Sequence, residues 1–200
     1  MANIDDFKAS LIGGGARANQ FRVTITAPTG ISTGLEAHLR RTSFLVRAAN
    51  LPGQTLTPIE VPFRGRKIYI AGDREFADEW TTTVMNDTDF MVRTGIENWM
   101  NGINDLADGT GKTSPSDYQT DLMVEQLDRD NKVLKHYIFR YAWPTSVAAI
   151  DLTSDQADAI EEFDITWRYQ YFEASKVSSA VRPIISPGGS AAEPDINDVQ

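Results

Sequence analysis

Hydrophobic and polar residues alternate along much of the chain, with the period of two that is typical of β-strands. Phe21, Val23 and Ile25 lie on one side of such a pattern, and the residues between them are polar. The longest example runs from Phe163 to Tyr171, where every second residue is large and apolar. Each of these segments predicts a strand with one buried face.

Two further alternating segments predict a β-hairpin over residues 121–143. They are joined by residues 128–131, which are rich in Asp and Asn and therefore favour a turn. The odd-numbered positions of the second arm, which share one face of a strand, carry most of its large apolar residues: Val133, Tyr137, Phe139, Tyr141 and Trp143. Pro144 is expected to end the ladder, because proline cannot donate a backbone hydrogen bond.

The region between residues 43 and 76 predicts more extended structure. Residues 43–50 are expected to form a strand, and Ile59 begins another alternating run that changes phase beyond Gly65. The chain is expected to change direction at Gly65 and again at Gly72 and Asp73. Since short turns join most of these strands, the sequence favours a mainly β fold, an antiparallel sheet closed into a barrel or sandwich.

One α-helix is predicted after residue 87, and Asn86 or Asp87 can cap it with a side-chain oxygen. Its apolar residues recur at steps of three or four: Val92, Ile96, Trp99, Ile103 and Leu106. Gly95 lowers the intrinsic stability of this helix, so we expect the helix to depend on docking against the sheet. A shorter helical turn is predicted over residues 35–41.

Three segments are expected to be irregular. Residues 1–15 form a flexible N-terminal arm that ends in consecutive glycines, and residues 107–117 form a polar loop. Residues 175–200 contain few large apolar side chains, so they are expected to be an extended or disordered tail, mobile in isolated subunits.

Composition excludes several classes of protein. The 200 residues suit one domain, and the absence of cysteine excludes disulfides and thiolate metal sites and fits a reducing compartment. The polar first residues are not typical of a secretory signal, and no apolar run approaches the roughly 18 residues of a membrane span. A net charge of −9 argues against a protein that grips nucleic acid.

The charge is unevenly distributed. Residues 36–76 carry seven basic and four acidic side chains, whereas residues 151–200 carry three basic and ten acidic ones. This asymmetry has two interpretations. It reflects scatter plus an acidic tail, or opposite ends of the subunit meet in neighbouring copies.

Several short motifs suggest chemistry, but each lacks a required part. Residues 109–113 resemble the end of a phosphate-binding loop, yet Leu106 stands where the first glycine is needed. Residues 128–131 suggest calcium, yet Val133 occupies the position that should be glycine. We therefore interpret both segments as turns or loops.

Titratable and aromatic residues also fail to form an enzyme signature. His38 and His136 are the only histidines and lie far apart in sequence. Glu161 and Glu162 are adjacent, so on a strand they would point to opposite faces. The aromatic strands could form a sugar-stacking platform of a carbohydrate-binding sandwich, but five apolar residues of one parity are more typical of a core. A hydrolase is the weakest alternative.

Residues 61–87 carry a longer and more specific pattern, with matching positions spread over one continuous order. They are Arg66, Lys67, Ile68, Ala71, Gly72, Asp73, Arg74, Phe76, Trp80, Val84, Met85, Asn86 and Asp87. This pattern resembles the tail tube proteins of contractile-tailed bacteriophages of the T-even type. The likeness continues through Asn19, Phe21, residues 143–145 and Phe163, so it covers about residues 16–174 as one domain.

The resemblance implies a mechanical function and no catalytic, cofactor or metal site. Members of this family form a small antiparallel β-barrel with a flanking helix, and six copies make rings that stack into a hollow tube. The implied partners are other copies of the chain, the contractile sheath, the tape-measure protein, and the baseplate and tail-terminator proteins. DNA would pass through the lumen without specific binding. The implied location is the virion tail, assembled in the bacterial cytoplasm, and no membrane binding is expected.

The basic segment around Gly65 is the candidate contact between subunits. We expect Arg64, Arg66, Lys67, Asp73 and Arg74 to project into an adjoining copy, and a solvated hairpin tip is the alternative. Residues 29–41 depart from the family pattern as an added loop, and the tail after residue 175 departs as an extension. Either could decorate the exterior of a tube. A baseplate tube initiator and the tube of an injection system are rival functions within the same fold.

Overall fold

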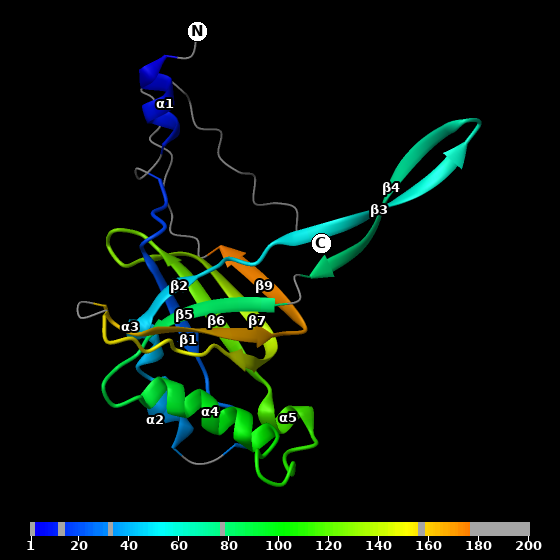
Figure 1. Cartoon of the computed structure of the whole chain (residues 1–200). Helices are drawn as coiled ribbons and strands as arrows, with labels where there is room; N and C mark the ends of the chain where they lie inside the picture. The colour runs from blue at the N-terminus through cyan, green and yellow to red at the C-terminus, as the bar shows by residue number, and fades with distance from the viewer. Residues whose placement is uncertain (1–2, 12–14, 32–33, 77–78, 156–158, 177–200) are drawn as a thin grey trace, which may run out of the picture.

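The computed structural model describes residues 3–11, 15–31, 34–76, 79–155 and 159–176. Figure 1 shows a β-barrel body with α2, α4 and α5 at one end, α1 beyond the other end, and a long hairpin that points away from the barrel. The strands are β1 Phe21–Ile25, β2 Val46–Ala49, β3 Gln54–Phe63, β4 Arg66–Phe76, β5 Glu79–Met85, β6 Thr120–Leu127, β7 Val133–Val147, β8 Glu162–Arg168 and β9 Tyr171–Lys176. The helices are α1 Ile4–Ser10, α2 Leu35–Leu39, α3 Thr42–Leu45, α4 Met91–Ile103 and α5 Pro115–Tyr118.

All described strand pairs are antiparallel, as the short turns predicted. The barrel sheet has the order β1-β6-β7-β8-β5-β2, and β9 adds to β7. The hairpin of β3 and β4 forms a separate two-stranded sheet. The predicted mainly β fold with a flanking α-helix is therefore confirmed, and α1, α3 and α5 are short helices that were not predicted from the sequence.

Strand β7 belongs to both halves of the barrel. Its first part pairs with β6 and β9, and its last part pairs with β8. The strand changes direction at Tyr141, whose φ of 56° lies in the left-handed region. There Arg140 and Tyr141 together face the single residue Asp121, which is the geometry of a β-bulge.

The bulge overturns two details of the sequence prediction. Tyr141 was expected on the same side as Phe139, but the extra residue reverses the phase, so Ala142 is buried and Tyr141 is exposed. Pro144 was expected to end the ladder. Instead β7 continues to Val147 with a second irregularity after Pro144.

The barrel core has the alternating residues that the sequence predicted. Val23 and Ile25 of β1 are buried, and so are Phe163, Ile165 and Trp167 of β8. The predicted single strand to Tyr171 is wrong, because β8 ends at Arg168 and β9 begins at Tyr171.

Aromatic rings fill the centre of this core. The rings of Trp80 and Phe139 stack with centroids 4.3 Å apart, and Trp99 of α4 lies 5.6 Å from Trp167. The aromatic residues Phe163 and Trp167 of β8 are therefore part of the barrel core. The alternative that this strand forms a platform for stacking sugars is wrong.

Helix α4 begins at Met91 with Phe90 at the N-cap position, so the cap predicted at Asn86 or Asp87 is wrong by one turn. Asp87 Oδ1 accepts a hydrogen bond from the backbone N–H of Met91 at 3.0 Å, so Asp87 satisfies one of the unpaired donors of the first turn. Val92, Ile96 and Trp99 are buried. Leu106 lies beyond the end of the helix and is 93% exposed, so it is not part of the packed stripe.

The segment predicted as an added loop, residues 29–41, contributes Ile31, Leu35 and Leu39 to the core. Leu35 and Leu39 of α2 are buried and pack against α4. A Cβ atom at Gly95 would lie 2.9 Å from the Cβ of His38, so the glycine allows the two helices to approach closely. The predicted helical turn over residues 35–41 is confirmed, and α4 docks on α2 as well as on the sheet.

The strand predicted over residues 43–50 is shorter than expected. Helix α3 occupies its first residues, and β2 begins at Val46. The loop predicted over residues 107–117 contains the short helix α5 at its end. Within the predicted N-terminal arm, residues 4–10 form α1, and the first two residues of the predicted tail belong to β9, so irregular structure is wrong for these parts. Residues 1–2, 12–14 and 177–200 lie outside the described residues.

Candidate assembly surface

The β3–β4 hairpin is built on a tight two-residue turn. Arg64 and Gly65 have φ values of 47° and 79°, as the turn that matches the twist of a β-hairpin requires. The change of direction predicted at Gly65 is therefore confirmed. Figure 1 shows the hairpin extending well beyond the barrel.

The second change of direction, predicted at Gly72 and Asp73, is wrong. Strand β4 continues through both residues, which together face Thr57 of β3 in a bulge. A Cβ atom on Gly72 would lie 2.5 Å from the carbonyl oxygen of Thr57, so the bulge brings the two backbones very close. The sequence correctly marked an irregularity, but the irregularity is a bulge and not a turn.

One face of the hairpin is almost entirely apolar. The register places Ile59 opposite Ile70, and Val61 opposite Ile68. Phe63 extends the same face toward the tip, because side chains two residues apart on a strand share a face. These five side chains are between 38% and 56% exposed, so the barrel does not cover them. We call Ile59, Val61, Phe63, Ile68 and Ile70 the apolar face.

The opposite face of the hairpin is more polar. Glu60 lies opposite Tyr69, and Pro62 lies opposite Lys67. The Nζ atom of Lys67 lies 2.8 Å from a carboxylate oxygen of Glu60. The hairpin therefore has two chemically distinct sides although every described residue of β3 is exposed.

The structure places the five predicted contact residues at two ends of the hairpin. Arg64 and Arg66 lie at the tip with Lys67, and the guanidinium of Arg64 sits 5.5 Å from the ring centroid of Phe63. Asp73 and Arg74 lie toward the barrel, beyond the bulge, and Arg74 donates to Gln54 at 2.6 Å. Of the five, Lys67 and Arg74 already have polar partners within the hairpin.

The sequence prediction emphasised the charges and missed the apolar face. The alternation of Ile59, Val61 and Phe63 was visible, but such a pattern normally indicates a face buried in the same chain. The available signal was the phase change at Gly65, which placed Ile68 and Ile70 on the same face. Together the two runs produce a ribbon with an unpartnered hydrophobic side.

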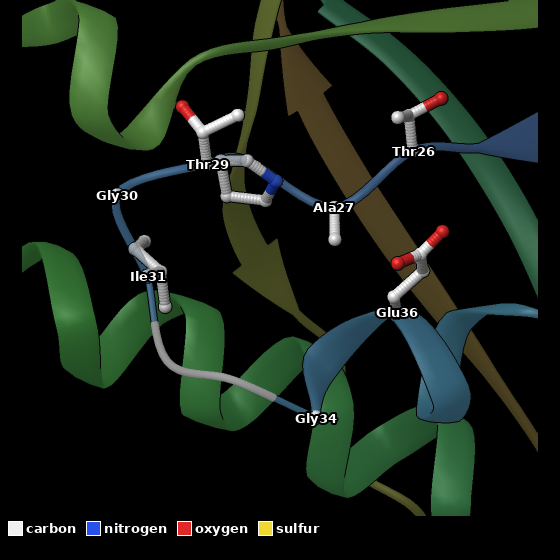
Figure 2. Close-up of a pocket in the computed structure, with 8 residues that line it drawn as sticks. Thr26, Ala27, Thr29, Gly30, Ile31, Gly34 and Glu36 are labelled. Carbon is white, nitrogen blue, oxygen red and sulfur yellow. The ribbon is translucent and has the colours of Figure 1, made fainter.

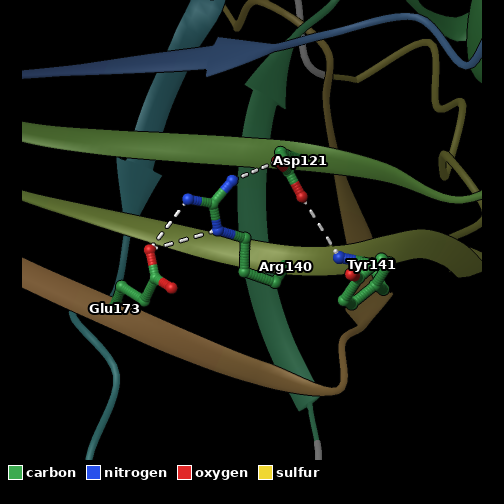
Figure 3. A network of polar contacts seen from close by, with 4 residues as sticks. All are labelled: Asp121, Arg140, Tyr141 and Glu173. Atoms are coloured by element: carbon green, nitrogen blue, oxygen red, sulfur yellow. Dashed lines mark hydrogen bonds and ion pairs between the residues drawn. The ribbon is translucent and has the colours of Figure 1, made fainter.

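A polar network lies across the barrel strands at the Tyr141 bulge. Arg140 donates to Asp121 at 2.5 Å and to Glu173 at 2.8 Å, and Asp121 also accepts from the backbone N–H of Tyr141 at 3.3 Å (Figure 3). Hydrogen bonding to Glu173, and then to Asp121, raises the pKa of Arg140 further above its ordinary value. The network links β6, β7 and β9 and fixes the bend of β7.

The segments that resembled binding motifs form ordinary loops. In the first, the hydroxyl and then the backbone N–H of Thr110 donate to Asp108 and lower the pKa of its carboxyl. In the second, Asn131 adopts a positive φ in the turn between β6 and β7. Neither arrangement is the glycine-rich cradle or the calcium loop that the corresponding chemistry requires.

The titratable residues considered from the sequence are also separated. The ring nitrogen Nδ1 of His38 donates to the carbonyl of Gly34 at 2.9 Å, while His136 lies on β7. Glu161 accepts from Asn86, and Glu162 pairs with Arg47. Among the described residues, no group of three or more His, Asp or Glu side chains could hold a metal ion.

A surface hollow lies where residues 26–31 meet the start of α2. Figure 2 shows it lined mainly by small residues and threonines, with the apolar side chain of Ile31 and with Glu36 at one side. Glu36 is the one ionisable side chain among its described lining residues.

None of the helices in the described part of the chain has the length and apolar character of a membrane span.

Known proteins share both the sequence pattern and the fold. A family model described as phage tail tube protein matches residues 16–175. The tail tube protein gp19 of Enterobacteria phage T4 is 35% identical over 136 residues, which cover 66% of this chain and 80% of that protein. The tail tube protein of Serratia phage KSP90 is 28% identical over 171 residues, covering 84% of this chain and 95% of that protein.

Solved structures show the same architecture. A chain of the PVC sheath-tube complex, from an extracellular contractile injection system, has a TM-score of 0.58 at 13% identity and covers 88% of this chain and 100% of its own. A chain of the anti-feeding prophage cap has a TM-score of 0.56 at 14% identity, covering 81% and 91%. At these identities the likeness concerns the fold alone. The family model, in contrast, matches most of the sequence, and it therefore shows that this chain belongs to the phage tail tube protein family.

Proposed function

We propose that this tail tube protein forms six-membered rings that stack into a hollow tube, and that the β3–β4 hairpin joins neighbouring copies. Membership of the family makes the chain a structural component of the virion tail. The observation that carries the finer proposal is the apolar face of the hairpin. Exposed apolar surfaces of this kind mark sites of protein–protein contact.

Burial of the apolar face supplies the driving force for this contact. Five large side chains are each about half exposed in a single copy. Full burial of such a side chain is worth about 1.5–3 kcal/mol relative to full exposure, so covering what remains exposed contributes several kcal/mol in total. That gain offsets part of the entropy lost when copies associate.

The hairpin also needs support from outside its own chain. β3 and β4 pair with each other and do not join the barrel sheet. An isolated two-stranded hairpin is at best marginally stable in water, and its outer edges expose unpaired backbone groups. A neighbouring copy supplies both the missing apolar cover and partners for these edges.

The geometry fits open assembly. A projecting hairpin contacts a different surface on the next copy, and such head-to-tail contacts generate rings or stacked filaments. We propose six copies to a ring, and a lumen through which DNA passes. The net charge of −9 supports this, because few phosphates would be gripped by basic side chains.

The proposed partners are the other parts of a contractile tail. Chains of similar fold occur in structures named as a sheath-tube complex, a tube-terminating cap and a baseplate. By this analogy we propose that the tube contacts a sheath, a terminator and a baseplate, and holds the tape-measure protein during assembly. The relatives are structural proteins, and we propose no catalytic role for this chain.

Electron microscopy of the purified chain tests the proposal. The unmodified protein should form tubes in negative stain. Val61→Asp with Ile68→Asp places two charges at one cross-strand pair of the apolar face and should leave a folded monomer in light scattering and circular dichroism. Glu60→Gln, on the opposite face, is the control and should still form tubes.

Two outcomes would contradict the proposal. A wild-type chain that stays monomeric at high concentration would exclude self-assembly. Tubes that form unchanged from the double aspartate variant would exclude the apolar face as the contact. A chain that stops at single rings would indicate a baseplate tube initiator rather than the tube itself.

A further inference from the structure

We propose that helix α1 of one copy packs against the apolar face of the β3–β4 hairpin of another copy. The inference rests on the proposed function, because it names the element of the second copy that covers the hairpin. It follows from two exposed apolar surfaces that match in size and that belong to elements of opposite net charge.

Helix α1 carries an apolar stripe that a single copy leaves uncovered. Ile4, Phe7 and Leu11 follow each other at steps of three and four residues, so they share one side of the helix. Their exposed fractions are 70%, 65% and 43%, and α1 has no buried residue. A helix of seven residues is too short to be stable by itself in water, so α1 needs a surface to pack on.

The apolar face of the hairpin has the dimensions of this helix. Seven helical residues extend about 10 Å at 1.5 Å per residue. The run from Ile59 to Phe63 extends about 13 Å, and two paired strands present a width close to the diameter of one helix. The stripe of α1 can therefore lie along the ribbon and cover both strands.

The net charges of the two elements are opposite in sign. Helix α1 carries Asp5, Asp6 and Lys8, which leaves one net negative charge. Because consecutive residues are separated by about 100° around a helix, Asp5 and Asp6 lie on the side of α1 away from the stripe, and Lys8 lies beside it. Arg64 and Arg66 stand at the tip of the hairpin, and neither forms an ion pair with a described residue. Lys67 differs, since Glu60 already neutralises it. The contact thus joins a helix with one net negative charge to the uncompensated part of the basic tip.

The contact requires a second copy. Within one copy, both the stripe of α1 and the apolar face are exposed, and Figure 1 shows the two elements on separate sides of the barrel. Docking between copies covers both surfaces at once and repeats from subunit to subunit. It also gives the N-terminal arm a structural role in the tube.

Disulfide trapping in mixed tubes tests this contact, because the chain has no cysteine of its own. Chains with Phe7→Cys are mixed with differently tagged chains carrying Val61→Cys, assembled and oxidised. Since a disulfide needs Cβ atoms about 3.5–4.5 Å apart, the matched control Glu60→Cys on the opposite face should cross-link roughly tenfold less. The cross-linked product is resolved by tag and mass on a non-reducing gel.

The outcomes separate this inference from the proposed function. Tubes in which Phe7→Cys cross-links equally to both positions would overturn the inference and leave the tube assignment intact. Cross-links within single chains that carry both substitutions, at dilutions that prevent assembly, would overturn the role of a second copy. Failure of the wild-type chain to form tubes would contradict the proposed function itself.

A second measurement uses the unmodified chain, in case the cysteine variants assemble poorly. Hydrogen exchange read by mass spectrometry should slow in both α1 and residues 59–63 when monomers become tubes. Exchange in α1 that stays equally fast in monomers and tubes would overturn the inference.

Discussion

The indole N–H of Trp167 donates a hydrogen bond to the hydroxyl of Thr82 at 3.0 Å in the interior of the barrel. Both side chains are fully buried. Thr82 is therefore a polar residue that the core requires, since a buried indole N–H without an acceptor retains its full desolvation penalty. The pair also joins β5 to β8 through side chains, in addition to the backbone ladder between them.

Substitution of Thr82 tests this pair. Thr82→Val keeps the shape but removes the acceptor, so we expect a loss of about 1–3 kcal/mol in the free energy of unfolding. Thr82→Ser keeps a hydroxyl and should lose less. Urea denaturation, measured in the monomeric Val61→Asp/Ile68→Asp background, avoids any contribution from assembly. Equal stability of the valine and wild-type residues would show that the hydrogen bond makes no net contribution.

Gly95 provides a test of the contact between α2 and α4. In an exposed helix, alanine would be favoured over glycine by up to about 1 kcal/mol. Here the added Cβ atom would press against the Cβ of His38, which cannot move without α2, and such overpacking costs about 1–3 kcal/mol. We therefore expect Gly95→Ala to lower the thermal midpoint of the monomer.

The exposed position Asn98 on the same helix gives the control for Gly95. Asn98→Ala should leave the midpoint unchanged or raise it, because alanine has the higher helix propensity and the site is open. A stabilised Gly95→Ala protein would contradict the close approach of the two helices.

Reversal of charge tests the basic tip of the hairpin. Arg66→Glu with Lys67→Glu should leave a folded monomer and abolish tubes in electron micrographs. Lys67→Glu alone removes the attraction to Glu60 and places two carboxylates together, whereas Arg66→Glu alone acts on a residue with no ion pair to a described partner. We therefore expect Arg66→Glu to reduce tube formation while leaving the stability of the monomer nearly unchanged. Lys67→Glu should also lower the stability of the monomer. Tubes of normal length from the double variant would contradict a role for the charged tip.

The Arg140 network predicts a local effect with little change in global stability. All three side chains are partly exposed, and such ion pairs contribute about 0–1 kcal/mol. Glu173→Gln should therefore change the unfolding midpoint only slightly. It should nevertheless speed hydrogen exchange in β9, whose described backbone pairs with β7 along one edge. Unchanged exchange in residues 171–176 would show that the ladder alone holds β9.

The sequence predicted the barrel because its strands obey simple alternation. Val23 and Ile25, or Phe163 and Ile165, are buried at the positions that a period of two requires. The helix was predictable from its apolar period, but its start at Met91 was not, since Asp87 reaches the first backbone N–H from the turn before the helix. These elements depend on local pattern, so their burial could be derived without knowledge of the topology.

Other features depend on contacts between distant residues and were not predictable. The phase reversal at Tyr141 arises because Asp121, on another strand, faces two residues of β7. The burial of Leu35 and Leu39 depends on the space that Gly95 leaves on α4.

The candidate site was only half predicted. The basic residues near Gly65 drew attention to the hairpin, but alternation cannot tell whether the covering surface belongs to the same chain or to another. The apolar face was therefore missed.

The hairpin is inserted between β2 and β5, which lie side by side in the barrel. In the proposed tube, a pull by a neighbouring copy on the hairpin would reach both strands from the same end. The load would then fall on the ladder between β5 and β8, which runs from the Glu79–Arg168 pair to the Met85–Glu162 pair. A force along the strands loads all the hydrogen bonds of this ladder at once, in shear, instead of breaking them one after another. Each subunit could then carry tension along the tube.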